Sequence, residues 1–353
     1  MLLEDQRYMQ RAFDLAALGK GNVTPNPIVG ALLVYEGRII GEGYHRAYGE
    51  AHAEVNAVDS VQPEDRKYIP HATLYVSLEP CNIHRNTPPC TLLILRERIP
   101  RVVISCLDHT PGVDGSGVQR LRDAGVEVAV GVLEEQGRRL SNIRNTYVQQ
   151  RRPYVILKWA QSADGQFAPQ TQQQLWLTNA FSKRLVHKWR SEVDGVLVGY
   201  QTALTDDPRL NNRLYYGPQP KRVVVDRNGS LPAELNLLDG SLATFVVTNK
   251  QVSPKFAPAN AKVLPVLQPG GEWPKQALQA LAEQGVSALI VEGGGKTLRA
   301  FIKSGCWDEA RVFKAATFMG QGRPAPTLPV APRQSFRLGG DRLFWYLNSL
   351  NLH

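Results

Sequence analysis

The sequence predicts two consecutive α/β domains. Its 353 residues exceed the usual size of a single hydrophobic core, and a hydrophobic content of 43% supports sizeable cores. Apolar segments of strand length alternate with segments of helical periodicity along both halves, which favours sheets covered by helices. A polar run at 149–152 precedes Pro153 and separates the two series. We therefore expect one domain at residues 1–150 and a second at 151–353.

The first series begins with a helix and a hairpin. Apolar residues recur at helical spacing over 8–18, before Gly19 and Gly21. Segments 31–35 and 38–40, split by Glu36-Gly37, predict a hairpin. The remaining elements expected here are helices at 52–58 and 118–123 and strands at 73–78, 102–106 and 126–130. Together they predict an α/β sandwich with one mixed sheet.

The second series is richer in strands. We expect strands at 154–160, 195–198, 222–226, 244–248 and 288–291 and a helix at 183–190. Stretches rich in Gly, Pro and Asn lie between them at 211–220, 228–240 and 249–274. The polar segment 170–174 predicts a loop.

Composition narrows the function classes without deciding among them. The formal charge of +9 suits nucleic acid, but it equally suits small phosphorylated substrates and phosphate-bearing cofactors, and no basic run of five residues occurs. No apolar run approaches a membrane span, and the N-terminus lacks the layout of a secretion signal. Four cysteines suit a reducing compartment. We expect a cytoplasmic protein that binds neither membranes nor nucleic acid.

One constellation of residues indicates metal chemistry. His52-Ala53-Glu54 is followed by Pro80-Cys81 and Pro89-Cys90, which offer one imidazole and two thiols. Three protein ligands leave the fourth tetrahedral position of Zn²⁺ open for water, as in catalytic sites. The metal lowers the pKa of that water, and Glu54 can move protons. His-x-Glu with Pro-Cys and a second Cys is typical of zinc deaminases, although eight residues separate the cysteines here, which points away from nucleic-acid editors.

A closed structural zinc site is the alternative. His45, His71, His84 and His109 are each available as a fourth ligand. The open site is favoured because the structural interpretation gives no role to Glu54 or to the proline before each cysteine.

Motifs in both halves support a more specific interpretation. In the first half they are Thr24-Pro-Asn-Pro-Ile-Val-Gly30, Gly41-Glu-Gly-Tyr-His45, His52-Ala-Glu-Val55, Leu78-Glu-Pro-Cys81 and Thr87-Pro-Pro-Cys90. In the second half they are Arg152-Pro153, Lys158, Ser162-Ala-Asp-Gly165, Trp176-Leu-Thr178, Val198-Gly199, Thr202, Asp206-Asp-Pro-Arg-Leu210, Val225-Asp226 and Val291-Glu-Gly-Gly294. In this order the motifs resemble those of the bifunctional riboflavin-biosynthesis deaminase–reductases, the family called RibD or RibG.

The resemblance implies a cytidine-deaminase-like three-layer α/β/α domain in the first half. Its reaction would be hydrolytic deamination of a phosphoribosylated diaminopyrimidinone. By position, His52, Cys81 and Cys90 would hold Zn²⁺, and Glu54 would be the catalytic proton shuttle. Substrate contacts would come from Asn26, His45 and Asp108. Two alternatives stay open, namely that Asn26 is only a turn residue between prolines and that His45 is an ordinary loop histidine.

For the second half the resemblance implies a dihydrofolate-reductase-like α/β domain that uses NADPH to reduce the ribosyl group to ribityl. The cofactor would be lined by Ala160, Trp176, Thr178, Thr202, Asp206, Gly294, Gly295, Lys296, Thr297 and Leu298. The substrate would be faced by Lys158, Arg190, Leu210, Arg213 and Glu292. Arg190 and Arg213 suit its phosphate. The segment 291–298 predicts a strand, a Gly-rich turn and a helix N-terminus, which can bind an anion.

The chain departs from the family pattern at three places. Arg85-Asn86 stands where the family usually has Gly followed by Lys or Arg, Thr110 stands where it usually has Asn, and Gln174 stands where Ser is common. Arg85 is one hypothesis for the displaced cation.

Two other functions compete with this interpretation. A zinc-containing nucleic-acid-binding protein would explain the charge, and a nucleoside or tRNA deaminase would explain only the first half. We expect a homo-oligomer whose partner is a small phosphorylated pyrimidine, with Zn²⁺ and NADPH as cofactors.

Overall fold

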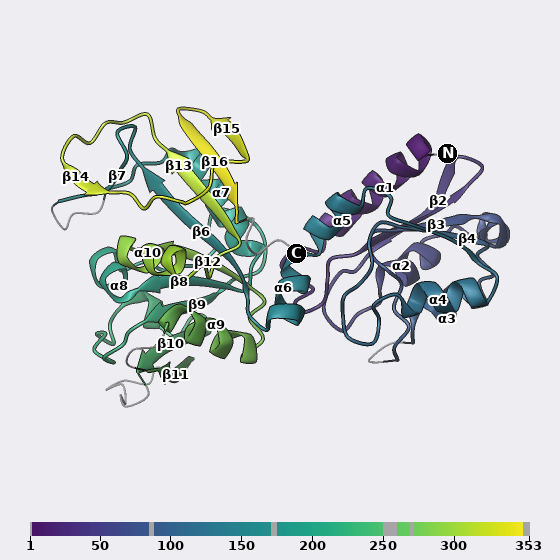
Figure 1. Ribbon diagram of the computed structural model, residues 1–353, viewed down its shortest axis with the longest axis horizontal. Coiled ribbons are helices and arrows are strands. Elements are labelled where there is room, and N and C mark those ends of the chain that lie inside the picture. Colours follow the sequence, from purple (N-terminus) through teal and green to yellow (C-terminus); the bar gives the residue numbers. More distant parts are fainter. Residues whose placement is uncertain (1, 85–87, 171–174, 250–259, 269–271, 349–353) are drawn as a thin grey trace. The chain divides into compact units, whose positions relative to one another are not determined.

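The computed structural model of the chain describes residues 2–84, 88–170, 175–249, 260–268 and 272–348. It forms two compact units, Met1–Arg151 and Arg152–His353, each with its own sheet (Figure 1). The division falls within the polar run at 149–152. Within the described ranges, no helix combines the length and apolar character needed to cross a membrane.

The sheet of the first unit is mixed and five-stranded. Its strands are β1 (Gly30–Tyr35), β2 (Arg38–Tyr44), β3 (Thr73–Val76), β4 (Arg101–Ile104) and β5 (Glu127–Val130), in the order β2-β1-β3-β4-β5. Strand β1 is antiparallel to β2 and β3, and β3, β4 and β5 are parallel. The hairpin and the single mixed sheet expected from the sequence are both confirmed.

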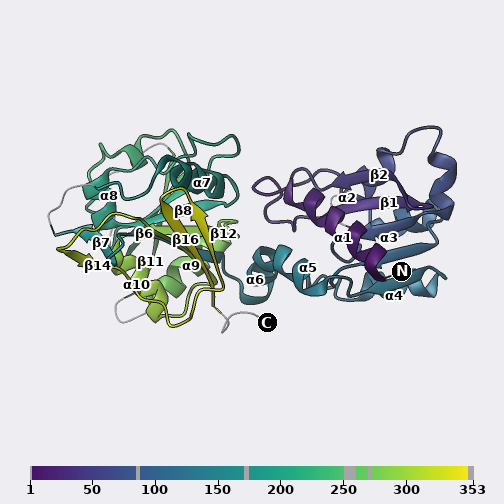
Figure 2. The same cartoon turned by 90° about the horizontal axis from the view of Figure 1, so that it is seen from above.

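Helices cover both faces of this sheet (Figure 2). Helices α1 (Leu2–Ala17) and α5 (Glu134–Leu140) lie on one face, where Met9 and Phe13 pack against Leu32 and Val34. The opposite face carries α2 (Ala53–Asp59), α3 (Cys90–Arg96) and α4 (Ser116–Asp123). The 3-10 helix η1 (Arg66–His71) and α6 (Asn142–Gln150) complete the unit. Alternate residues of β1 point to opposite faces, so the fold is the expected three-layer sandwich.

Strand β2 corrects one expectation. The second hairpin strand, expected to end at residue 40, continues through Gly41-Glu42-Gly43 to Tyr44. A Cβ atom at Gly41 would lie 2.3 Å from the Ala57 carbonyl oxygen, and one at Gly43 would lie 2.3 Å from the Ala57 nitrogen. The glycines therefore serve close packing of β2 against α2, the helix that begins beside His52 and carries Glu54.

The second unit contains a nine-stranded sheet in the order β11-β10-β9-β8-β12-β6-β13-β16-β15. Its strands are β6 (Tyr154–Gln161), β8 (Gly195–Gly199), β9 (Lys221–Val225), β10 (Thr244–Asn249), β11 (Ala261–Leu267), β12 (Ala288–Gly293), β13 (Glu309–Lys314), β15 (Gln334–Leu338) and β16 (Asp341–Leu347). The seven strands from β11 to β13 are parallel, and β16 and β15 continue antiparallel. A small ribbon pairs β7 (Gln166–Pro169) with β14 (Gly322–Pro324).

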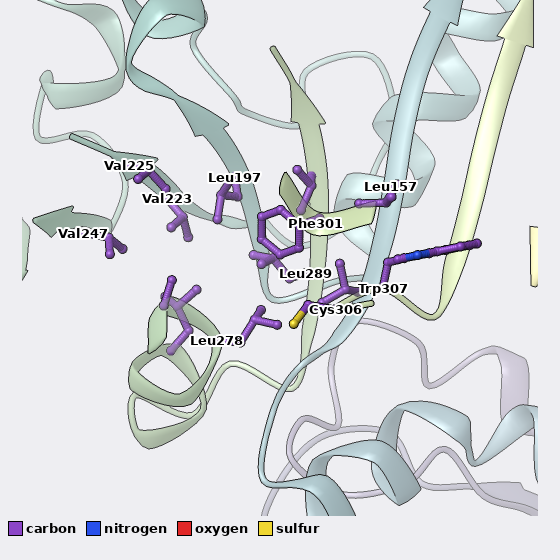
Figure 3. Close-up of a cluster of buried hydrophobic side chains, with 14 of the residues drawn as sticks. Leu157, Leu197, Val223, Val225, Val247, Leu278, Leu289, Phe301, Cys306 and Trp307 are labelled. Atoms are coloured by element: carbon purple, nitrogen blue, oxygen red, sulfur yellow. The ribbon is translucent and has the colours of Figure 1, made fainter. Parts of the chain in front are cut away.

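Helices α7 (Ala180–Ser191), α8 (Tyr200–Asp206), α9 (Trp273–Glu283) and α10 (Gly295–Lys303) and the 3-10 helix η2 (Asn236–Leu238) flank this sheet. Figure 3 shows part of the core, in which Phe301 of α10 and Leu278 of α9 pack with Leu289 of the central strand β12. Full burial of one such side chain is worth about 1.5–3 kcal/mol. The packed core holds β6, β8 and β12 side by side, so their carboxyl ends meet at one edge.

Candidate active sites

The candidate metal centre lies where two helices of the first unit begin. His52 immediately precedes α2, Cys90 is the first residue of α3, and Cys81 lies in the loop after β3. The His52 Nδ1 atom is 3.3 Å from Cys90 Sγ and 3.5 Å from Cys81 Sγ. All three candidate ligand atoms lie within 4.8 Å of one another. The structure thus brings together the three residues that the sequence pairs with zinc.

The donor set fits an open zinc site. Among the described residues, His52, Cys81 and Cys90 form the metal-ligand group without a fourth member, so His45, His71, His84 and His109 do not close it. Hydrogen bonds from Cys90 lower the pKa of the Cys81 thiol to about 4, which favours the thiolate that a metal binds. One imidazole with two thiolates is a donor set that zinc prefers, and it leaves one coordination position for water.

Glu54 is held beside this centre without joining it. It lies in the first turn of α2, its side chain is buried, and it lines the same pocket as His52 and Cys81. Burial raises the pKa of its carboxyl. A buried carboxyl at this place can exchange protons with a substrate that reaches the metal.

The pocket also contains the three predicted substrate contacts, Asn26, His45 and Asp108. The Asn26 Nδ2 atom lies 3.1 Å from His45 Nε2, and His45 Nδ1 lies 3.0 Å from the Ala51 carbonyl oxygen. Because a carbonyl oxygen can only accept, Nδ1 carries the proton, and Nε2 of the neutral ring accepts from the Asn26 amide. Burial lowers the pKa of His45 and favours that neutral ring. His45 therefore orients Asn26.

Glu79 shapes the pocket and was not identified from the sequence. Its buried carboxylate accepts backbone N–H groups from Asp108, Gly115, Gly117 and Val118 at 2.9–3.3 Å. Asp108 in turn accepts the Thr110 N–H at 2.8 Å. These bonds hold the loop after β4 against the pocket. The signal was available in Leu78-Glu-Pro-Cys81, where only the cysteine received a role.

Arg144 is the second residue that sequence reasoning missed. It lies on α6 and lines the pocket. Its Nη1 donates to the Pro25 carbonyl oxygen at 3.0 Å and its Nη2 to Thr110 Oγ1 at 3.2 Å. No local pattern could identify it, because its partner Pro25 is 119 residues away along the chain.

In the second unit, three of the predicted substrate residues form a charged cluster. Glu292 of β12 accepts two hydrogen bonds from Arg190 of α7, at 2.7 and 2.9 Å, and one from Lys158 of β6 at 3.5 Å. Burial opposes ionisation of Glu292, but Arg190 and Lys158 outweigh it and lower the pKa of the carboxyl to about 2. The cluster is therefore ionised and its geometry is fixed by bidentate pairing.

The other two predicted substrate residues lie in the segment after α8. Arg213 is exposed, and its backbone N–H donates to Nδ1 of the buried His187 at 3.1 Å. Burial, together with Arg190 and Arg213, lowers the pKa of His187 to about 4. The Leu210 side chain packs in a core cluster with Val196 and Val224, so only its backbone can face a ligand.

The predicted cofactor turn joins β12 to α10. Gly294 precedes the first turn of α10, whose backbone N–H groups can bind a phosphate. A Cβ atom at Gly294 would lie 2.7 Å from Thr202 Oγ1, and one at Gly199 would lie 2.3 Å from Thr297 Oγ1. The glycines thus allow the backbone of these two turns to pack closely against the Thr202 and Thr297 side chains. Leu298 is fully buried in the core, so its side chain does not line this turn.

The remaining cofactor candidates are spread along the same unit. Trp176 is 60% exposed, and Lys183 Nζ lies 4.3 Å from the centre of its ring. Ala160 lies near the end of β6, Asp206 ends α8, Lys296 is exposed on α10, Gly295 begins α10, and Thr178 precedes α7. Arg85, Asn86 and Gln174, the departures from the family pattern, lie outside the described residues.

Comparisons with known proteins assign a family to each half of the chain. Residues 3–106 match the cytidine and deoxycytidylate deaminase zinc-binding region, and residues 153–338 match the RibD C-terminal domain. The riboflavin biosynthesis protein RibD of Aquifex aeolicus is 42% identical over 319 residues, which cover 90% of this chain and 88% of that protein. RibD of Escherichia coli is 31% identical, with 93% and 92% covered.

Solved structures extend the likeness to the fold. A diaminohydroxyphosphoribosylaminopyrimidine deaminase/5-amino-6-(5-phosphoribosylamino)uracil reductase from Thermotoga maritima has a TM-score of 0.88 and 34% identity, with 98% of each chain covered. Acinetobacter baumannii RibD, form 1, has a TM-score of 0.88 and 32% identity, with 98% and 99% covered. The chain therefore belongs to the RibD family of riboflavin biosynthesis enzymes, in which a zinc-binding deaminase region precedes a reductase domain.

Proposed function

We propose that the unit Met1–Arg151 hydrolyses the amino group of a phosphoribosylated diaminopyrimidinone, and that the unit Arg152–His353 reduces the ribosyl group of the product with NADPH. The grouping of His52, Cys81 and Cys90 around an open position, with Glu54 in the same pocket, carries the first assignment. The similar protein from Thermotoga maritima, whose description names both reactions, supports the pair.

In the first reaction, His52, Cys81 and Cys90 would hold zinc, which when bound lowers the pKa of water toward neutrality. The Asn26 amide, oriented by His45, holds a ring edge by donating and accepting hydrogen bonds. Glu54 takes a proton from the attacking water, delivers it to the ring nitrogen, and then transfers a proton to the departing ammonia. One water is consumed and one ammonia is released for each amine replaced by oxygen.

In the second reaction, the turn at Gly294 and the start of α10 would bind phosphates of the nicotinamide cofactor, which supplies the hydride. Lys158, held by Glu292 near the carboxyl end of β6, faces the ribosyl group. Arg190 is fixed by the same carboxylate and offers a positive charge near the substrate phosphate. The parallel strands place these groups at one edge of the sheet, where open α/β sheets bind ligands.

One experiment tests both assignments. The zinc-loaded protein is given the diaminopyrimidinone phosphate with NADPH, and ammonia release and cofactor absorbance are followed together. We expect both signals, with ammonia first. Lys158→Ala should stop NADPH oxidation and spare ammonia release, whereas equal loss of both signals would contradict separate sites. Retention on RNA or DNA at physiological salt with no turnover would favour the nucleic-acid-binding alternative instead.

A further inference from the structure

Carboxylates outnumber arginine and lysine side chains among the described residues that line the deaminase pocket. Its described lining includes four carboxylates, contributed by Glu50, Glu54, Glu79 and Asp108. Arg144 is the single arginine or lysine among the described residues that line it. A phosphate monoester carries about −1.5 to −2 charges at pH 7, and a wall rich in carboxylates repels it unless a cation faces it.

Arg144 is held in place by two neutral acceptors. The Pro25 carbonyl oxygen accepts from Nη1 and Thr110 Oγ1 accepts from Nη2. These acceptors fix the guanidinium plane between the two loops that carry Asn26 and Asp108. A planar guanidinium with five N–H donors is well suited to bind phosphate oxygens.

The loop contacts give this placement a second support. Thr110 is fixed by Asp108 Oδ1 through its own N–H, and Asp108 is fixed by Glu79 through its N–H. The acceptor that orients Arg144 therefore belongs to a chain of hydrogen bonds anchored on a buried carboxylate. Such a pre-organised cation loses little entropy when an anion binds.

We propose that Arg144 binds the substrate phosphate in the deaminase pocket and makes this unit select phosphorylated over dephosphorylated pyrimidine ribosides. The inference rests on the proposed function of the first unit and adds the residue that sets its substrate selectivity. Arg144 acts on binding of the substrate, and the bonds that form and break at the ring are left to Glu54 and the metal centre.

The test compares Arg144→Gln and Arg144→Lys with Arg138→Gln, an exposed arginine on α5 paired with Glu134. Each variant is assayed for ammonia release with the diaminopyrimidinone phosphate and with the same compound after phosphatase treatment. For Arg144→Gln, KM for the phosphorylated compound should rise by about 10- to 100-fold, the range for a lost hydrogen bond to a charged group. In this variant, kcat for the phosphorylated compound should not change, and neither should kcat or KM for the dephosphorylated compound. Arg144→Lys should fall between, and Arg138→Gln should match the wild type.

Inorganic phosphate gives an independent readout. It should inhibit deamination of the phosphorylated compound competitively in the wild type, because both anions would occupy the same position, and lose that inhibition in Arg144→Gln. Equal losses with both compounds would show a structural role and overturn the inference. An unchanged KM for the phosphorylated compound would overturn it too, as would a rise seen for Arg85→Gln and not for Arg144→Gln. A wild type that releases no ammonia from either compound would refute the proposed function itself.

Discussion

The metal centre of the first unit and the charged cluster of the second stabilise buried polar groups in opposite ways. Arg190 and Lys158 both donate hydrogen bonds to Glu292, so the negative charge of the carboxylate is compensated by cations of the protein itself. His52, Cys81 and Cys90 instead bring three candidate ligand atoms within 4.8 Å of one another, a donor set to which a bound metal would add positive charge. If the first site holds a metal as proposed, its electrostatic balance depends on a ligand, whereas that of the second depends on the fold.

The difference predicts which property changes in each unit when a charged side chain is replaced by an uncharged one. In the first unit, a substitution beside the metal should change chemistry with little effect on stability. In the second unit, loss of one charge should leave others buried without compensation, and stability should fall.

The largest effect is expected for Glu54→Gln. The amide keeps the size of the side chain but cannot carry a proton between water, ring and leaving group, so kcat for ammonia release should fall by about 10²–10⁴-fold. Zinc content, thermal stability and NADPH oxidation measured with the deaminated pyrimidine phosphate as substrate should match the wild type. Asp59→Asn, an exposed position at the end of the same helix, is the control. Appreciable residual deamination would remove Glu54 from its role.

Glu292→Gln should act mainly on stability. It leaves the partly buried Arg190 and Lys158 without their carboxylate, and breaking a fully buried pair typically costs about 3–5 kcal/mol, which is the upper limit expected here. Denaturant unfolding of the full chain, followed by a signal from the second unit, measures the loss. Glu283→Gln, exposed on α9, serves as the control. If the two variants unfold at the same denaturant concentration, the cluster does not stabilise the fold.

Acid should sharpen the same contrast. The folded pKa of Glu292 is about 2, below the ordinary value near 4.5, so its stabilising contribution is present above the unfolded pKa. As the pH falls from about 5 toward 2, Glu292 becomes protonated in the unfolded chain but stays ionised in the folded one. The free energy of unfolding therefore decreases by on the order of 3 kcal/mol. His187 faces the same cluster and, with a folded pKa of about 4, adds to the acid loss from higher pH.

The contribution of Glu292 is isolated by the difference in unfolding free energy between wild type and Glu292→Gln at each pH. That difference should shrink below pH 5. A difference that stays constant to pH 2 would show that Arg190 and Lys158 do not hold the carboxylate ionised.

The sequence identifies a site residue where the signal lies in a short motif, and it misses a residue whose contacts arise only in the tertiary fold. His52 and Glu54 lie on one helical turn and each cysteine follows a proline, so short motifs identified the metal centre. Arg144 meets Pro25 only through the tertiary fold, and no motif marks it. Leu298 and Leu210 were assigned by position, but the structure shows that both side chains belong to core clusters.

The same distinction explains the fold. Apolar strands such as β8 and β9 were found because their buried runs are short and continuous. Strand β13 was missed because it contains Glu309 and Arg311, which pair with each other. Strand β15 is largely exposed, and β11 contains Pro265 within a stretch that reads as loop. These segments form strands because they pair with neighbouring strands in the sheet, and that pairing cannot be read from the local sequence.

The smallest effect is expected at the cofactor turn, where a substitution changes the packing of side chains and leaves the charges unaltered. A methyl group at Gly294 would approach Thr202 Oγ1 to 2.7 Å, so Gly294→Ala should displace the turn and raise KM for NADPH by about tenfold, within an overpacking cost of about 1–3 kcal/mol. Gly340→Ala, whose new methyl group would meet open space, is the control. Combining Gly294→Ala with Thr202→Ala should recover part of the loss if the contact is the cause. A KM equal to that of the control would place the cofactor phosphates away from this turn.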